Sequence, residues 1–291
     1  NIGEKFKYFK FGSFQNPLGI CFHPKAIEML VSRSVHHALF TEKDLFFHNE
    51  RWHCFDAHSD LSDVSETVLL KKLNDGLQTT HQKLRNSTHV MLTLGTAWVY
   101  KYNASAVVVA NCHKVPQKEF SKELLSVATI QKSLETIIDL IKSINPKAHF
   151  IFTISPVRHV KDGYVENQIS KAHLISAIHN LINSPTYDRG RGGAYFPSYE
   201  IMMDELRDYR FYEADMLHPN QVAVDYIWEK FVQVWISEET LPTMEKVDAV
   251  QKGLLHRPFN PDSLKHQEFL KSLETKITYL QQRYPFMRFN S

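Results

Sequence analysis

The sequence contains no long apolar run and no marked excess of one charge. Its apolar stretches, such as residues 106–110, fall far short of the roughly 20 residues that a membrane-spanning helix needs, so we expect no membrane association. Lys and Arg total 34 against 32 for Asp and Glu, giving a formal charge of +2. A field this weak does not collect polyanions, so we also expect no nucleic-acid partner.

Cysteine is scarce too, and its three positions form no disulfide framework. No signal-peptide pattern opens the chain, although it begins with Asn rather than Met, and a cytoplasmic location is the default prediction. Each cysteine lies close to a histidine, and these two residue types are common metal ligands: Cys21 and His23, His53 and Cys54, Cys112 and His113. None of these spacings is that of a zinc hairpin, so we predict no metal and no cofactor.

Helical and strand patterns alternate through most of the chain. Residues 63–85 carry apolar positions at helical spacing and precede an apolar strand at 89–94; residues 123–144 and 150–154 repeat the pattern. Further helices are expected at 166–183 and 220–237. This alternation predicts an α/β fold with a mostly parallel sheet covered on both faces, in a main domain of residues 1–237.

Insertions and a tail complete the expected organisation. Hairpins are predicted at 98–110, around Asn103-Ala104, and at 45–55, turning near Asn49-Glu50. Residues 184–195 are polar with three glycines and predict a loop. Residues 238–291 should form a helical extension that packs on the main domain or on a second copy, because one apolar stripe recurs there at heptad-like spacing: Leu270, Leu273, Ile277 and Leu280.

The strongest chemical signal is Asp215 three residues before His218, on a turn that precedes a helix. A histidine base needs a carboxylate at Nδ1 to fix its tautomer, and this spacing can supply one. The structural alternative is that Asp215 is a helix N-cap and His218 an ordinary surface histidine.

Two turns could supply backbone amides to an oxyanion. Gly95 and Thr96 follow a buried strand directly, and Gly19 ends the turn Asn16-Pro17-Leu18-Gly19. Each could equally be a turn that merely needs glycine.

Six ordered segments of the sequence resemble the GSCFA family of bacterial proteins, a branch of the SGNH (GDSL-like) hydrolase superfamily. They begin at Asn1 (NIGEK), Asn16 (NPLGI), Leu94 (LGTAWVY), Asn111 (NCHK), Ser155 (SPVRH) and Asp215 (DMLHPN). The resemblance covers residues 1 to about 234 and leaves the tail out.

The resemblance implies a three-layer, flavodoxin-like fold and a serine nucleophile that follows the first strand. His218 would be the base, Asp215 its orienting acid, and Gly19, Gly95 and Thr96 the oxyanion contacts. Ala97 stands where the superfamily usually has an oxyanion-donating Asn. The Gly-Ser-Cys-Phe-Ala motif would lie just upstream of Asn1, so residues 1–291 alone are expected to be inactive; Ser13, expected in the second strand, is interpreted as structural.

Four residues of the resembling segments are candidates for substrate binding. Arg158 and His159 follow the strand at 150–154 and should lie on the same rim as the dyad, where a guanidinium could bind a carboxylate or phosphate; the alternative is a rim ion pair. Asn111 and His113 are either a pocket wall or satisfied polar residues at a strand end.

Two hypotheses follow. The first is a serine-type hydrolase or acyltransferase acting on short acyl esters of a small molecule or glycan. The second is a non-catalytic ligand-binding protein that keeps the same fold.

Overall fold

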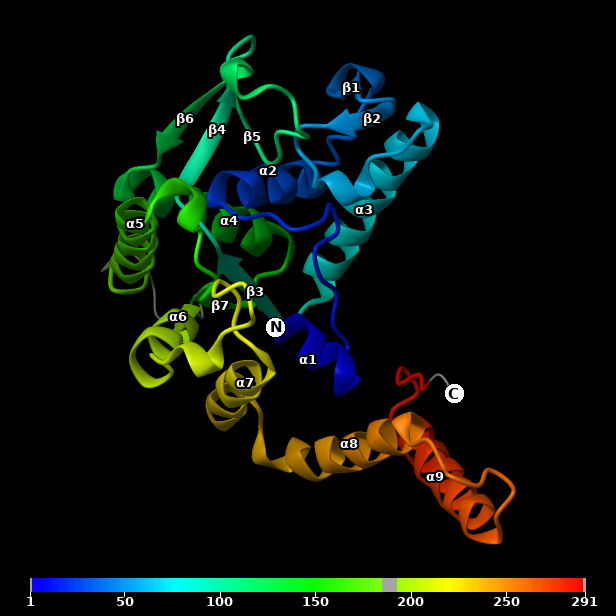
Figure 1. The fold of residues 1–291 in the computed structure, drawn as a ribbon. Coiled ribbons are helices and arrows are strands. Elements are labelled where there is room, and N and C mark those ends of the chain that lie inside the picture. The colour runs from blue at the N-terminus through cyan, green and yellow to red at the C-terminus, as the bar shows by residue number, and fades with distance from the viewer. Residues whose placement is uncertain (1, 185–192, 290–291) are drawn as a thin grey trace. The chain divides into compact units, whose positions relative to one another are not determined.

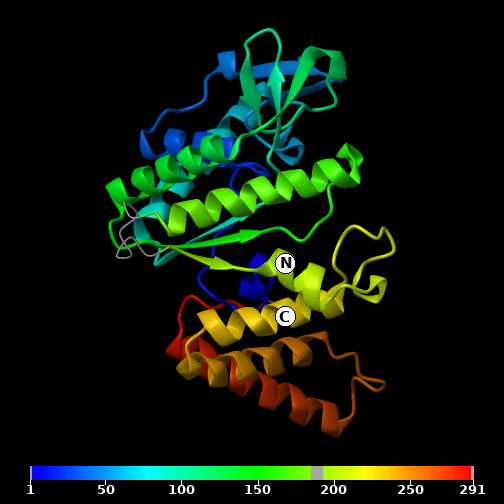
Figure 2. The ribbon, with the colours of Figure 1, turned by 90° about the vertical axis from the view of Figure 1, so that its left-hand side faces the viewer.

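A computed structural model describes residues 2–184 and 193–289. The chain forms two compact units, one of Asn16–Ala223 and one that combines Asn1–Gln15 with Val224–Ser291. Figure 1 and Figure 2 show the elements of both. The predicted boundary at residue 237 lies inside the second unit.

The larger unit contains a parallel sheet with strand order β3-β7-β8: His89–Leu94, His149–Ile154 and Gly193–Phe196. β3 and β7 are in register from His89 opposite His149 to Leu94 opposite Ile154, so both strands end at the same edge. β3 pairs with no other described strand on its far side.

Helices α2 (Pro24–Val35), α3 (Glu66–Asn86), α4 (Val127–Ile144) and α5 (Tyr164–Ile182) belong to this unit. The main core joins β3 and β7 to α4 and α5, with fully buried side chains such as Leu94, Ile137, Phe152 and Leu174. Figure 2 shows α5 running along β7 and β8. The predicted α/β class with a parallel sheet is confirmed.

Both predicted hairpins are present. β1 (Leu45–His48) and β2 (Arg51–Cys54) pair antiparallel, and Asn49 and Glu50 between them have φ values of 47° and 60°, as a two-residue type I′ turn requires. β4 (Trp98–Tyr102) and β5 (Val107–Val109) form the second hairpin.

The predicted helix at 123–144 begins too early. Residues Phe120–Leu124 form strand β6, which pairs antiparallel with β4 from Trp98 opposite Leu124. α4 starts only after Ser126, whose Oγ accepts the Thr129 amide at 3.1 Å. The sequence pattern could not separate a strand from the helix that follows it after two residues.

Two further sequence predictions need correction. Residues 11–15 form no strand, so Ser13 is an exposed residue of irregular chain rather than part of a second strand. Of the predicted loop, residues 185–192 lie outside the described residues, and 193–195 belong to β8, where Ala194 pairs with Ile151.

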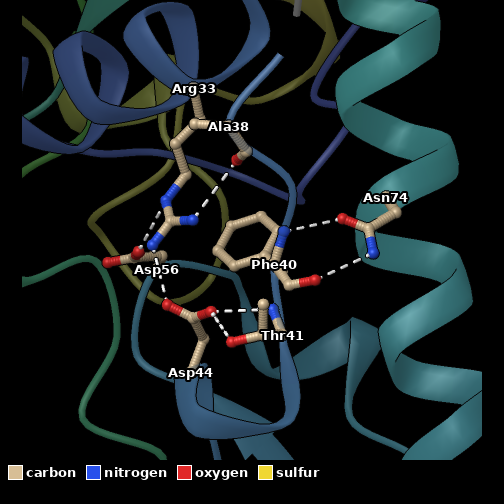
Figure 3. A network of polar contacts seen from close by, with 7 residues as sticks. All are labelled: Arg33, Ala38, Phe40, Thr41, Asp44, Asp56 and Asn74. Carbon is tan, nitrogen blue, oxygen red and sulfur yellow. Dashed lines mark hydrogen bonds and ion pairs between the residues drawn. The ribbon is translucent and has the colours of Figure 1, made fainter. Parts of the chain in front are cut away.

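A polar network joins α2 and α3 to the segments that flank the β1–β2 hairpin (Figure 3). The Arg33 guanidinium lies 4.2 Å above the Phe40 ring, donates to Asp44 Oδ1 at 2.8 Å and lies 3.5 Å from Asp56 Oδ2. Asn74 of α3 exchanges hydrogen bonds of 2.8 and 3.1 Å with the Phe40 backbone. The chain is therefore anchored to α2 and α3 where it enters and leaves the hairpin.

The short α6 (Ser198–Glu200) follows β8 and leads into a single π-helical stretch, Ile201–Glu205; α7 spans Gln221–Trp235. In the second unit α1 (Ile2–Tyr8), α8 (Leu241–Leu255) and α9 (Leu264–Arg283) are helices. The predicted helical tail is confirmed. Among the helices of the described ranges, none has the length and apolarity to cross a bilayer.

Candidate active site

Asp215 and His218 form a hydrogen-bonded pair. His218 Nδ1 lies 2.6 Å from Asp215 Oδ2. The second carboxylate oxygen, Oδ1, accepts the backbone amides of Leu217 at 2.8 Å and His218 at 3.0 Å. These hydrogen bonds, with that of the His218 ring, hold the pKa of Asp215 down to about 2, so the acid is a carboxylate at any ordinary pH.

The loop that carries this pair is closed by its own backbone. Glu213 N donates to His218 O at 2.8 Å and Asn220 N donates to Phe211 O at 2.9 Å. Met216 takes the left-handed conformation, with φ of 58°, which allows the chain to reverse between acid and base. Three residues of separation are enough for contact because the turn folds back at this point.

The arrangement fixes the tautomer of His218. Since the Asp215 carboxylate can only accept, the neutral ring has its proton on Nδ1 and its lone pair on Nε2. Nε2 makes no hydrogen bond to any described residue, and the His218 side chain is 57% exposed. A histidine in this state can accept a proton from a group that approaches Nε2.

Arg158 contacts the same loop. Its backbone amide donates to Leu217 O at 3.3 Å, and its guanidinium lies 4.2 Å from the ring centroid of Tyr212 and 5.4 Å from that of Tyr209. No carboxylate of the described residues pairs with it. The loop after β7 thus brings a guanidinium, which lies over two tyrosine rings, to the loop that carries Asp215 and His218.

His159 lies at the rim beside Gly95. A Cβ added to Gly95 would lie 3.3 Å from His159 Nε2. Burial is the largest cause that lowers the pKa of His159 to about 4; the charge of Lys171 and that of a protonated His218 act in the same direction, and Asp162 opposes them. His159 is therefore neutral near pH 7 and lies within electrostatic reach of His218.

The predicted oxyanion donors already donate to backbone carbonyls. Gly95 N and Thr96 N both donate to Phe22 O, at 2.8 and 3.1 Å, and Gly19 N donates to Asn16 O at 2.9 Å. The Gly95–Thr96 amides could bind an oxyanion only if Phe22 moved away from the turn.

Among the described residues, no hydrogen bond, ion pair or ring contact joins Asn111 or His113 to Asp215 or His218. The Asn111 side chain accepts the His113 amide, and His113 Nε2 donates to Cys54 O at 2.7 Å while its Nδ1 lies 3.2 Å from His53 Nδ1. These contacts place both residues beside the end of β2, where the Cys54 and Phe55 carbonyls accept hydrogen bonds from them.

Comparison with family models assigns the chain. The GSCFA family model matches residues 1–231. The chain belongs to the GSCFA family. A second model, the C-terminal domain of GSCFA domain proteins, matches residues 247–291, so the tail that the sequence resemblance left out is also typical of such proteins. No curated protein and no solved structure matches the chain.

Three polar residues of this GSCFA chain lie at the site edge and were not predicted: Asn167, Ser170 and Lys171 of α5, all buried. Asn167 Oδ1 accepts the His159 amide at 2.9 Å, and Ser170 Oγ accepts the Ala97 amide at 2.7 Å. They occupy the stripe that continues with Leu174, Ala177 and Ile178. The sequence pattern that could have predicted them is the presence of polar residues on an otherwise apolar face of the helix.

The cysteines of the GSCFA chain are not arranged for chemistry. All three are free, and burial raises the pKa of Cys21 and Cys112 to about 11 and that of Cys54 to about 12. These thiols remain protonated and unreactive near neutral pH. In the described ranges no group of three or more His, Cys, Asp or Glu side chains could hold a metal ion.

Proposed function

We propose that this GSCFA protein is a serine-type hydrolase or acyltransferase that acts on short ester-linked acyl groups. His218 is the general base, Asp215 orients it, and the nucleophilic serine lies upstream of Asn1. The observation that carries the proposal is the 2.6 Å contact between His218 Nδ1 and a carboxylate that two amides hold in place.

The chemistry follows the usual course of serine acyl transfer. The serine Oγ attacks the ester carbonyl as His218 Nε2 takes its proton. The imidazolium, stabilised by the Asp215 carboxylate, then gives that proton to the departing alcohol. Water or a second hydroxyl accepts the acyl group in the second half, with His218 again as base.

The substrate we infer is a small-molecule or glycan ester with an anionic group. Arg158 supports this, because its guanidinium lies over the Tyr212 ring and pairs with no described carboxylate. A planar guanidinium binds a carboxylate or phosphate through two parallel hydrogen bonds.

The test uses protein that includes the residues upstream of Asn1. It is assayed on short-chain p-nitrophenyl esters and labelled with a fluorophosphonate serine probe. We expect His218→Ala to lower kcat by on the order of 10²-fold or more, and Asp215→Asn to lower it because an amide would favour the wrong imidazole tautomer. His36→Ala, which removes an exposed histidine, is the matched control and should leave kcat unchanged.

Residues 1–291 alone should show no esterase activity. An esterase rate that depends on Ser13 would overturn the assignment of the nucleophile. If the probe does not label the protein and no ester is hydrolysed, the proposal that it is an enzyme is rejected.

A second function is favoured by one observation. The three predicted oxyanion amides, of Gly19, Gly95 and Thr96, all donate to carbonyls, and Ala97 offers no side-chain donor. A non-catalytic protein that binds an ester or anion on the same rim would need none of these groups. Binding of a ligand without turnover, weakened by Arg158→Met, would support this alternative.

A further inference from the structure

Lys171 of α5 is a buried lysine. The residue is 1% exposed, and no carboxylate of the described residues lies within ion-pair distance of Nζ. A buried ammonium without a countercharge is costly and has to be held by hydrogen bonds.

The partners of Lys171 are the carbonyls at two strand ends. Nζ donates to Gly95 O at 2.7 Å and to Ser155 O at 2.7 Å. Gly95 directly follows β3 and Ser155 directly follows β7, and Ser155 N donates to Leu94 O at 2.8 Å. One amino group therefore clamps the carboxyl ends of two neighbouring parallel strands.

Both clamped segments lead into the candidate site. The first is the Gly95–Thr96 turn. The second carries Arg158 and His159, and the Arg158 amide reaches Leu217 of the dyad loop. Two neighbours of Lys171 on α5 hold the same two segments: Ser170 Oγ accepts a hydrogen bond from the Ala97 amide, and Asn167 Oδ1 accepts one from the His159 amide.

We propose that Lys171 is a positioning residue of the candidate active site, which fixes the turn after β3 against the loop after β7 so that His159, Arg158 and the dyad loop share one rim. Its catalytic importance rests on the proposed function; its positioning role does not. Lys171 reaches the dyad only through these backbone segments and acts on no substrate.

The link does not require the charge. Burial lowers the pKa of Lys171 to about 7, and a neutral amine still has two N–H groups, one for each carbonyl. The other groups near Nζ are the Tyr199 ring, 5.5 Å away, and the His159 ring, whose pKa Lys171 lowers.

The first test compares Lys171→Met with Lys161→Met, which removes an exposed lysine of the same rim. We expect Lys171→Met to shift the backbone amide NMR signals of residues 95–97 and 155–159 and to raise the pKa of His159, read from its imidazole signals. Lys161→Met should leave the amide signals in place. A folded Lys171→Met with unchanged signals and an unchanged His159 titration would refute the proposal.

A second measurement needs no variant and covers a Lys171→Met protein that does not fold. In the wild type, the carbonyl ¹³C signals of Gly95 and Ser155 should titrate together with the Lys171 Cε signal. Carbonyls that do not follow Lys171 would refute the clamp.

Activity separates the two proposals. With the upstream residues present, Lys171→Met should lower kcat about tenfold or more while KM changes less. The reason is that a displaced rim impairs the orientation of the catalytic groups more than the binding of the substrate. If the wild type shows no turnover, the proposed function fails, and the NMR results still decide the role of Lys171.

Discussion

His23 shows how burial turns a titratable side chain into a structural one. It is 4% exposed; its Nδ1 accepts the Ala26 amide at 3.1 Å as the N-cap of α2, and its Nε2 donates to Val109 O at 3.0 Å. The neutral imidazole satisfies both contacts, whereas a protonated ring would lose the cap. Burial lowers the pKa of His23 to about 4.

This shift predicts acid sensitivity. Because the unfolded His23 titrates near 6.5 and the folded one near 4, its contribution to stability is complete above pH 6.5 and is lost as the pH falls toward 4. His23→Asn keeps a good N-cap residue but does not titrate. We expect its free energy of unfolding, from urea titrations at several pH values, to fall less steeply over that range than the wild type's.

The control for this prediction is His36→Asn, at an exposed histidine. Its pH dependence should parallel the wild type's. If His23→Asn and the wild type lost stability in parallel between pH 6.5 and 4, the imidazole of His23 would not be the group that resists protonation.

At the scale of elements, α8 and α9 form a helical hairpin with a core of its own. Val247 and Val250 of α8 pack with Leu273 and Leu280 of α9. A Cβ on Gly253 would lie 2.6 Å from Leu273 Cδ1, so the absence of a side chain there lets the helices approach closely. Of the predicted stripe, Leu273 and Leu280 are buried, Ile277 packs beside them, and Leu270 is 47% exposed.

Two leucines of α9 should therefore respond differently to truncation. Leu280→Ala, at a fully buried position, should cost about 2–5 kcal/mol because it leaves a cavity. Leu270→Ala should cost less than about 1 kcal/mol, as expected for a half-exposed side chain. Denaturant unfolding followed by circular dichroism measures both, and equal losses would show that the stripe does not face a core.

At the scale of the whole molecule, the two ends of the chain belong to one unit. Phe6 of α1 lies edge-on to Trp228 at 5.5 Å and to Phe231 at 5.7 Å, and Lys5 pairs with Asp225. Tyr8 Oη donates to Asp248 Oδ1 at 2.8 Å. The N-terminal helix thus packs with helices that follow more than 200 residues later.

The Tyr8–Asp248 hydrogen bond gives a direct measure of this association. Tyr8→Phe should lower the free energy of unfolding of this unit by about 1 kcal/mol, whereas Tyr164→Phe, at a 76% exposed tyrosine, should have little effect. In a double-mutant cycle with Asp248→Asn the two changes should be non-additive. Additive losses would mean that the two side chains are not coupled.

Local patterns accounted for much of the fold. The strand at 89–94 was predicted with its observed bounds, and the helix at 63–85 differs from α3 by three residues at its start and one at its end. Prediction failed where the secondary structure of a segment depends on a segment that packs beside it in space. Phe120–Leu124 is a strand because β4 lies beside it, and its own sequence did not separate it from α4.

The candidate site divides in the same way. Asp215 and His218 were visible in the sequence because three residues and one turn bring them together. Lys171 was not, because its partner carbonyls lie 76 and 16 residues away along the chain. The role of the Gly95–Thr96 amides also depended on a distant group, since Phe22 O accepts them.

The sequence by itself determined the alternation of helices and strands, the turn at Asn49-Glu50 and the acid–base pair, since spacing, turn propensity and short-range contact are encoded within a few residues. Tertiary structure decided the strand order β3-β7-β8, the pairing of β6, the clamp by Lys171 and the packing of α1 with the C-terminal helices. Those features depend on contacts between segments that are far apart in the sequence, and only the folded chain brings such segments together.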